Sequence, residues 1–352
     1  MKKISVRLPH KTVPVIIGGP INKFAAAFAK AVPARKILAV TNPLIRRMYG
    51  ARMAKSFRAA GIDLAWAEIP AGEKHKNLRS IERVYSRAVA AGLDRDSVIL
   101  ALGGGVVGDM AGFAAATLFR GIRYVQAPTT LLAMVDSSVG GKVGVDLKEG
   151  KNLAGAFYQP ELVYVSGEFL NTLPPREIKN GLGEIVKYAV ISDGKLFEYL
   201  EKTPPSEFKW DFVVERCVRA KAAVVEKDEY ETKGIREILN FGHTYAHALE
   251  KAASYKAVSH GEAVAAGVLK ECILAERLCG FKETRRVRNL LAALGLPTEA
   301  PESVSRRAVA AAVSRDKKIR GKNIRLYLPS SIGRAVFMEV SVDDIREKLA
   351  AF

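Results

Sequence analysis

The sequence predicts an α/β fold, in which a domain with a mainly parallel sheet is followed by a mainly α-helical domain. Over residues 35–165, short apolar runs alternate with amphipathic stretches in the order strand, helix, strand. Beyond Pro174 and Pro175, helical periodicity dominates. A chain of 352 residues is long enough for two domains. We therefore expect a first domain over residues 1–170 and a second over residues 171–352.

Each element of the first domain follows from its own pattern. Four apolar runs predict strands, and the almost wholly apolar run at 97–102 predicts a strand buried on both faces. The stretches between them have helical periodicity, and two of them end at Gly61 and Gly92. In chain order, the expected strands are 36–40, 63–69, 97–102 and 122–127, and the expected helices are 43–60, 78–91, 106–118 and 130–137. In the second domain, residues 322–329 predict a late strand or hairpin.

Two features of the composition indicate the compartment. No apolar run approaches the roughly 20 residues that cross a bilayer, and the amino terminus lacks the apolar core of a signal peptide. The three cysteines, Cys217, Cys272 and Cys279, form no Cys-x-x-Cys pair and are too sparse for a disulfide framework. We therefore expect a cytoplasmic protein that does not bind membranes.

The charge of the chain allows two interpretations. Fifty-five basic and 37 acidic residues give a net charge of +18, which is typical of proteins that bind nucleic acid. Aromatic residues, however, make up only 8% of the chain, and arginines are not interleaved with them in the way that stacks bases. We favour a solvated basic surface with a pocket for a small anion over a nucleic-acid partner.

A glycine-rich run lies between a predicted buried strand and a predicted helix: Gly103-Gly104-Gly105-Val106-Val107-Gly108-Asp109. Glycines let the backbone turn tightly and approach a diphosphate, and the helix amino terminus offers free N–H groups. The Gly-x-Gly-x-x-Gly pattern alone is weak, because an ordinary strand-to-helix turn has the same composition. Since the run does not follow the first strand of the domain, it predicts an atypical nucleotide site in a Rossmann-like nucleotide-binding domain.

Three of the five histidines fall within 18 residues, at His243, His247 and His260. His243 and His247 are four residues apart, so they share a helix face, and His260 precedes a helix that could return to the same place. Imidazoles combined with a carboxylate suit catalytic zinc, although two packed histidines and a capping one would fit the same spacing. Glu184 lies on an otherwise apolar helical stretch, and from the residues alone we interpret it as a solvent-facing carboxylate.

Two lysines lie among glycine and small polar residues. Lys142 ends the segment at 136–142, and Lys151 lies in the segment at 150–152. Lysines in such segments are predicted to lie in loops that reach for an anion, and a mobile surface loop is an equal alternative.

Taken together, the motifs resemble those of the 3-dehydroquinate synthases, a family of sugar-phosphate cyclases, over nearly the whole chain. Many long motifs in one order are specific, whereas any one of them alone is not. The segments that carry the resemblance are 103–109, 120–121, 128–132, 136–142, 150–152, 155–160, 183–188, 240–243, 260–264 and 315–318.

The resemblance implies a homodimer that binds NAD and a divalent metal, Zn²⁺ or Co²⁺. The NAD contacts that it implies are Asn42, Glu73, Lys76, Gly103, Gly104, Gly105, Val106, Val107, Gly108, Asp109, Thr129, Thr130, Asp136, Lys142, Lys151, Phe169, Leu170, Asn171 and Thr172. It implies Glu184, His243 and His260 as metal ligands, so that His247 would contact substrate instead of metal. The residues that it implies around the substrate are Lys142, Lys151, Asn152, Lys187, Lys221, Arg236, Asn240, His247 and one of Lys317 and Lys318, with Arg120 reaching the phosphate site of the other subunit.

The activity that the resemblance implies is that of a carbon–oxygen lyase of the shikimate pathway, which makes aromatic amino acid precursors. It would convert 3-deoxy-D-arabino-heptulosonate 7-phosphate to 3-dehydroquinate and phosphate by transient oxidation with NAD, β-elimination, re-reduction, ring opening and aldol closure. Another sugar-phosphate cyclase and a metal-dependent polyol dehydrogenase are the alternatives. Asn152, Arg236, Asn240 and the segment 316–318 match the dehydroquinate pattern, which argues against another cyclase.

Overall fold

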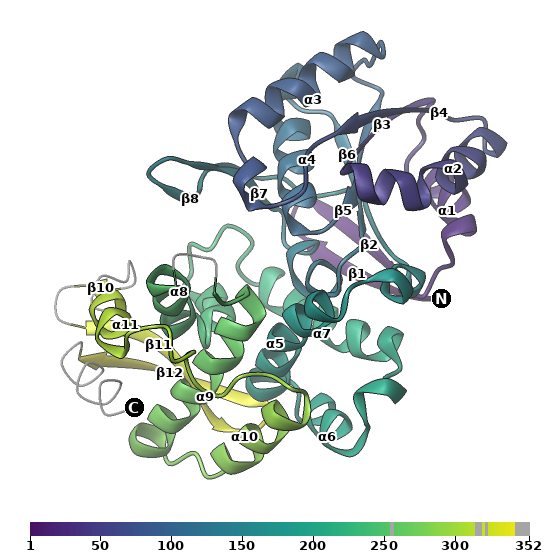
Figure 1. The fold of residues 1–352 in the computed structure, drawn as a ribbon. Coiled ribbons are helices and arrows are strands. Elements are labelled where there is room, and N and C mark those ends of the chain that lie inside the picture. Colours follow the sequence, from purple (N-terminus) through teal and green to yellow (C-terminus); the bar gives the residue numbers. More distant parts are fainter. Residues whose placement is uncertain (254–256, 314–318, 321–322, 342–352) are drawn as a thin grey trace. The chain divides into compact units, whose positions relative to one another are not determined.

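A computed structural model of the chain describes residues 1–253, 257–313, 319–320 and 323–341 (Figure 1). The chain divides into two compact units, the first unit (residues 1–173) and the second unit (residues 174–352).

The first unit is built on a seven-stranded sheet with the strand order β1-β2-β9-β6-β5-β3-β4. All pairs in this sheet are parallel except β1 with β2, so the predicted parallel sheet is confirmed. The hairpin of β1 and β2 was not among the four predicted strands. The strands are β1 (Lys2–Leu8), β2 (Lys11–Ile17), β3 (Lys36–Thr41), β4 (Asp63–Glu68), β5 (Val98–Gly103), β6 (Arg123–Pro128) and β9 (Leu162–Val165).

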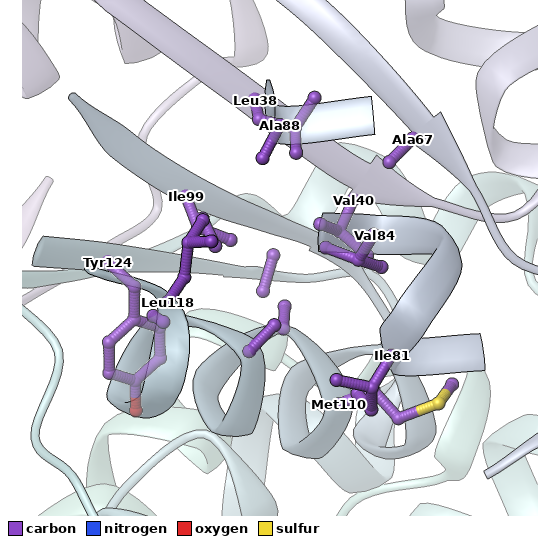
Figure 2. Packing of buried hydrophobic residues seen from close by; sticks show 14 of the residues in the cluster. Leu38, Val40, Ala67, Ile81, Val84, Ala88, Ile99, Met110, Leu118 and Tyr124 are labelled. Carbon is purple, nitrogen blue, oxygen red and sulfur yellow. The ribbon is translucent and has the colours of Figure 1, made fainter. Parts of the chain in front are cut away.

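Helices cover both faces of this sheet. The helices of the first unit are α1 (Phe24–Ala31), α2 (Pro43–Ala59), α3 (Leu78–Ala90) and α4 (Gly105–Thr117). Figure 2 shows Ile81 of α3, Met110 of α4 and Ile99 of β5 in one cluster of buried side chains on one face of the sheet. On the opposite face, Phe24 of α1 stacks on Tyr164 of β9, with ring centroids 4.6 Å apart. The predicted helix at 130–137 is present as a π-helical turn over Ala133–Ser137.

A separate two-stranded hairpin corrects one prediction. Lys142 and Lys151 were expected in loops, but they lie in strands β7 (Lys142–Leu147) and β8 (Gly150–Phe157). The glycines that suggested loops let the two strands approach closely, since a Cβ on Gly144 would lie 2.6 Å from the Ala154 carbonyl oxygen.

The second unit is mainly helical, as predicted. Its helices are α5 (Pro175–Ser192), α6 (Gly194–Lys202), α7 (Trp210–Val225), α8 (His243–Ala252), α9 (His260–Cys279), α10 (Thr284–Ala293) and α11 (Arg306–Val313), with a 3-10 segment η7 (Ile235–Asn240) before α8. The late strand predicted at 322–329 is confirmed as the middle strand of a three-stranded antiparallel sheet. That sheet consists of β10 (Ile319–Arg320), β11 (Asn323–Ser331) and β12 (Arg334–Ser341). Within the described ranges, no helix combines the length and apolar character needed to span a membrane.

Candidate metal centre and nucleotide site

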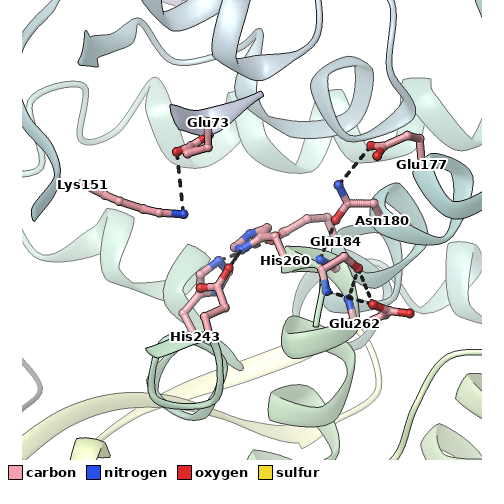
Figure 3. Close-up of polar contacts among 11 residues, drawn as sticks. Glu73, Lys151, Glu177, Asn180, Glu184, His243, His260 and Glu262 are labelled. Atoms are coloured by element: carbon pink, nitrogen blue, oxygen red, sulfur yellow. Dashed lines mark hydrogen bonds and ion pairs between the residues drawn. The ribbon is translucent and has the colours of Figure 1, made fainter. Parts of the chain in front are cut away.

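Three helices of the second unit bring one carboxylate and two imidazoles together. Glu184 lies in α5, and His243 and His260 are the first residues of α8 and α9. One potential ligand atom from each lies within 4.8 Å of the other two (Figure 3). Our interpretation of Glu184 as solvent-facing was wrong, because the residue is 0% exposed on a helix that is buried on every side over residues 181–191. The three residues that meet are those that the family resemblance implied.

Glycines adjacent to the three side chains allow the helices to approach this closely. A Cβ on Gly183 would lie 2.1 Å from the carbonyl oxygen of Gly261, so α5 and α9 are in backbone contact beside Glu184 and His260. A Cβ on Gly267 of α9 would lie 2.0 Å from the carbonyl oxygen of Gly242, which immediately precedes His243. Since neither backbone oxygen can move independently of its helix, larger residues at these positions would separate the ligands.

Hydrogen bonds fix which ring nitrogens face the centre. His243 Nδ1 lies 3.1 Å from the Phe241 carbonyl oxygen, and His260 Nδ1 lies 3.2 Å from Glu250 Oε1. Each Nδ1 therefore donates to an acceptor outside the centre, which leaves each Nε2 facing Glu184 as the nitrogen that would bind a metal after losing any proton it holds. Both Nε2 atoms lie 3.3 Å from Glu184 Oε1.

This donor set fits a divalent metal. Among the described residues, neither oxygen of Glu184 receives a hydrogen bond of good geometry, although both are buried. One carboxylate and two imidazole nitrogens that converge on one point suit zinc, and three protein ligands leave a position open for a substrate. The side chain of His260 is 33% exposed, so the centre is not sealed within its own unit.

The charges of the centre are set by burial and by neighbouring groups. Burial alone would raise the pKa of Glu184, but the Lys187 ammonium and His243 hold this pKa well below its ordinary value. Burial lowers the pKa of His243. Burial also opposes the charged form of His260, but its contacts with Glu184 and Glu250 raise its pKa to about 10. Without a metal, the His260 ring therefore holds a proton that a metal would have to displace.

Two buried carboxylates near the centre were missed by the sequence analysis. Glu250 accepts a hydrogen bond from Nδ1 of His260. Glu271 of α9 accepts a 2.8 Å hydrogen bond from the Gly242 backbone N–H, and this bond holds the turn before His243. Glu250 follows His243 by two helical turns on the same face of α8, and this spacing was the signal available in the sequence.

His247 shares a helix face with His243, as the spacing predicted, and their ring centroids are 5.3 Å apart. It does not belong to the described three-residue group, however, and its side chain is exposed. The prediction from spacing alone that both histidines bind one metal therefore receives no support from the geometry.

One buried cation pairs with Glu184, and two others are buried elsewhere in the same unit. Lys187 is 2% exposed, forms an ion pair with Glu184 Oε2 and donates a 3.0 Å hydrogen bond to the Leu239 carbonyl oxygen. This bond places the end of η7, which terminates at Asn240, beside Lys187. Arg236 in η7 is 3% exposed and donates to the Glu229 carbonyl oxygen at 2.7 Å. Lys221 is buried on α7, whereas Lys317 and Lys318 lie outside the described residues.

In the first unit, the residues expected to bind NAD gather at the carboxyl ends of adjacent parallel strands. Asn42 follows β3, Gly103 ends β5, and Thr129 follows β6. The chain order reverses between β3 and β5, because β4 follows β3 on one side and β5 lies on the other. In open α/β sheets, the crevice at such a switch point is where ligands bind.

The glycine turn leaves the amino terminus of α4 open. Among the described residues, no side chain caps this helix, and its first turn contains no acid, so the N–H groups and the positive dipole end suit an anion. The glycines make room for side chains: a Cβ on Gly104 would lie 2.9 Å from Thr130 Cγ2, and one on Gly105 would lie 3.0 Å from Ser137 Oγ. This arrangement fits the diphosphate of a dinucleotide.

A polar cluster joins residues expected at NAD with residues expected at the substrate. Lys76 is 4% exposed, and its ammonium donates to Asp109 Oδ2 at 2.6 Å and to Asn152 Oδ1. Burial opposes the charged form of Lys76, but Asp109 and other acids raise its pKa. Lys151 of the hairpin lies 3.7 Å from Glu73 (Figure 3). The hairpin and the loop before α3 therefore form one polar surface.

The segment expected at NAD and the arginine expected at the other subunit both lie in the first unit. The segment Gly167–Thr172 packs on α2, where the Tyr49 and Thr172 hydroxyls are 2.5 Å apart and Tyr49 meets Phe169 edge to face. Arg120 is exposed on a turn after α4, and both it and Phe119 have left-handed backbone angles, with φ of 66° and 52°.

Comparison with known proteins identifies the family. Residues 66–180 match the family model described as 3-dehydroquinate synthase N-terminal, and residues 181–319 match that described as 3-dehydroquinate synthase C-terminal. The chain is 44% identical to the 3-dehydroquinate synthase of Endomicrobium trichonymphae over 344 residues, 96% of this chain and 94% of that protein. The chain belongs to the 3-dehydroquinate synthase family. Another family member, from a Picosynechococcus species, is 46% identical over 326 residues, 90% of this chain and 89% of the relative.

Solved structures related to the 3-dehydroquinate synthase family agree with this assignment. A 2-deoxy-scyllo-inosose synthase complexed with carbaglucose-6-phosphate, NAD⁺ and Co²⁺ is 26% identical, with a TM-score of 0.89 and coverage of 99% of this chain and 100% of that chain. A 2-epi-5-epi-valiolone synthase from Streptomyces hygroscopicus with NAD⁺ and Zn²⁺ bound is 30% identical, with a TM-score of 0.87 and 98% coverage of both chains. A probable glycerol dehydrogenase from Sinorhizobium meliloti, 20% identical with a TM-score of 0.59, covers 96% of this chain and 95% of that chain and shares the fold alone.

Proposed function

We propose that the chain is a 3-dehydroquinate synthase, a lyase that converts 3-deoxy-D-arabino-heptulosonate 7-phosphate to 3-dehydroquinate and phosphate in the shikimate pathway. The observation that carries the proposal is the group of Glu184, His243 and His260, in a chain that matches named 3-dehydroquinate synthases over nearly its full length. Three free cysteines, two of them buried, fit a cytoplasmic enzyme.

Glu184, His243 and His260 would hold the metal, and the solved structures of two related cyclases contain Co²⁺ or Zn²⁺. When bound, Zn²⁺ or Co²⁺ supplies a Lewis acid that lowers the pKa of a coordinated hydroxyl. Lys187 contacts Oε2 of Glu184, whereas both histidines face Oε1, so the ammonium keeps the carboxylate ionised without occupying the ligand position.

The first unit would hold NAD along the carboxyl ends of β3, β5 and β6. When bound, NAD supplies a transient hydride acceptor and donor, so the cofactor is unchanged over a full turnover. The amino terminus of α4 would bind its diphosphate, and Lys76, fixed by Asp109, would add a positive charge at the rim. Asn42, Thr129 and the segment 169–172 would complete the cofactor site.

The substrate carries a phosphate and a carboxylate, and this explains the number of cations expected around it. Buried Lys187, Lys221 and Arg236 are stable beside an anion, because a buried cation needs a compensating charge or hydrogen bonds. The remaining proposed substrate residues are Lys142, Lys151, Asn152, Asn240, His247 and Lys318.

We also propose a homodimer in which Arg120 serves the phosphate site of the other subunit. Two consecutive non-glycine residues with positive φ cost of order 1–3 kcal/mol each, and such strain is typical of functional positions. Arg120 is exposed on this strained turn, so its side chain is accessible to a second subunit.

The proposed function is tested by phosphate release. Purified protein with Zn²⁺ and NAD is expected to release phosphate from 3-deoxy-D-arabino-heptulosonate 7-phosphate, and to release little from glucose 6-phosphate, which lacks the carboxylate. Absorbance of reduced nicotinamide should not rise during turnover. Phosphate release from glucose 6-phosphate but not from the heptulosonate phosphate would identify a different cyclase. Steady production of NADH would identify a polyol dehydrogenase.

A further inference from the structure

Glu250 lies in the last turn of α8 and reaches across to the first residue of α9. It is 8% exposed, and its Oε1 lies 3.2 Å from Nδ1 of His260. The opposite nitrogen of the same ring, Nε2, lies 3.3 Å from Glu184 Oε1. The ring of His260 is thus held between two carboxylates, of which only Glu184 belongs to the group of candidate metal ligands.

The two histidines of the centre are oriented in different ways. His243 Nδ1 faces a carbonyl oxygen of its own segment, that of Phe241, and the intervening Gly242 is bound by Glu271. The orientation of His243 is therefore set by backbone. His260 begins its helix and has a side chain that is 33% exposed, compared with 12% for His243. The His260 ring is packed less tightly than the His243 ring, so its orientation depends more on the hydrogen bond to Glu250.

We propose that Glu250 is a positioning residue of the metal centre: it accepts the Nδ1–H of His260 and thereby directs the Nε2 lone pair at the point shared by Glu184 and His243. This inference rests on the proposed function, because it assigns a role toward the metal proposed there. A carboxylate on the outer nitrogen fixes the tautomer and the ring, and it increases the basicity of the inner nitrogen. Loss of such a partner weakens metal binding about 10- to 100-fold.

Two substitutions separate orientation from charge. Glu250→Ala removes the acceptor and should weaken Zn²⁺ binding about 10- to 100-fold. Glu250→Gln keeps an oxygen that can accept the Nδ1–H in a nearly identical volume, so it should restore much of the affinity. Glu262→Gln is the matched control, since this carboxylate lies on α9 two residues after His260 but bonds the Ser259 backbone N–H and hydroxyl instead of an imidazole. The control should bind Zn²⁺ as the wild type does.

The experiment measures the Zn²⁺ dissociation constant by competition with a chromophoric chelator, together with the visible absorption bands of the Co²⁺-loaded protein. Thermal unfolding of each variant in excess chelator reports the stability of the metal-free fold. The expected result is weaker Zn²⁺ binding and altered Co²⁺ bands for Glu250→Ala, partial recovery in Glu250→Gln, and similar metal-free unfolding of Glu250→Gln and wild type.

Each outcome decides between the two proposals. Wild-type affinity and unchanged Co²⁺ bands in Glu250→Ala would overturn the role of Glu250 while leaving the metal centre intact. Equal losses in Glu250→Ala and Glu262→Gln would also overturn it, because the effect would then be a general one on α9. Failure of the wild-type protein to bind either metal would contradict the proposed function itself.

Discussion

The two candidate sites both depend on glycine, but the glycines make room for different neighbours. In the first unit, Gly104 and Gly105 lie against the side chains of Thr130 and Ser137. In the second unit, Gly183 and Gly267 lie against backbone carbonyl oxygens. A side chain can move by a few tenths of an ångström at small cost, whereas a carbonyl oxygen moves only with its helix. The nucleotide turn should therefore tolerate small changes that the metal centre does not.

The largest effect is expected for Gly183→Ala. The added Cβ would lie 2.1 Å from the Gly261 carbonyl oxygen, so α5 and α9 must separate and Glu184 must move away from His260. We expect loss of stoichiometric zinc binding and destabilisation by about 3 kcal/mol. Metal analysis and thermal unfolding test this. Gly194→Ala is the control, because its Cβ would lie 3.4 Å from the nearest atom; full zinc content in Gly183→Ala would contradict the account.

Lys76→Met should produce the next largest effect. Its ammonium is buried against Asp109 and Asn152, so its removal takes away a cation that is paired with the Asp109 carboxylate. Because Asp109 is 21% exposed, we expect a destabilisation of about 2–3 kcal/mol, below the range for fully buried pairs. Urea unfolding measures this loss. The double variant Lys76→Met/Asp109→Asn should recover part of it, and an additive loss would show that the pair is not coupled.

Gly104→Ala should have a smaller effect that is confined to the nucleotide site. Its Cβ would lie 2.9 Å from Thr130 Cγ2, so the turn shifts and NAD affinity should fall about tenfold, at a cost of about 1–2 kcal/mol. Adding Thr130→Ser removes the clashing methyl group and keeps the hydroxyl, which should restore part of the affinity. Fluorescence titration with NADH measures it, and a change in zinc affinity would count against the separation of the two sites.

Much of the first unit could be predicted because its signals are local. The apolar run at 97–102 identified β5, and the glycines after it identified the turn to α4, since both are properties of consecutive residues. The β7–β8 hairpin was missed for the converse reason. Its strands are short and rich in glycine, and their pairing depends on a partner strand, so composition alone indicated loops.

The metal centre could be predicted only in part, because its residues are brought together by contacts between segments that are far apart in the sequence. Spacing placed His243 and His247 on one face of α8, and the structure agrees, but the group that meets contains Glu184 instead of His247. The position of Glu184 depends on the contact of Gly183 with Gly261, which no local periodicity reveals. The family resemblance supplied this residue, and neither route identified Glu250.

The smallest and most gradual effect is that of pH on metal affinity. Contacts with Glu184 and Glu250 raise the pKa of His260 to about 10, so a proton must leave this ring when a metal binds. The pKa values of Glu184 and His243 are both lowered, so neither competes for a proton above pH 7. Apparent zinc affinity should therefore rise about tenfold per pH unit between pH 7 and 9. An affinity that levels off above pH 7 would indicate a His260 of ordinary pKa.

The most direct test of the central claim is phosphate release from 3-deoxy-D-arabino-heptulosonate 7-phosphate by protein that has been stripped of both metal and nucleotide. The assay has four arms: no addition, NAD alone, Zn²⁺ alone, and both together. Rapid release is predicted only when both are present, with one Zn²⁺ per chain sufficient for full activity. Rapid release in any other arm would contradict a mechanism that needs both the glycine turn and the glutamate–histidine centre.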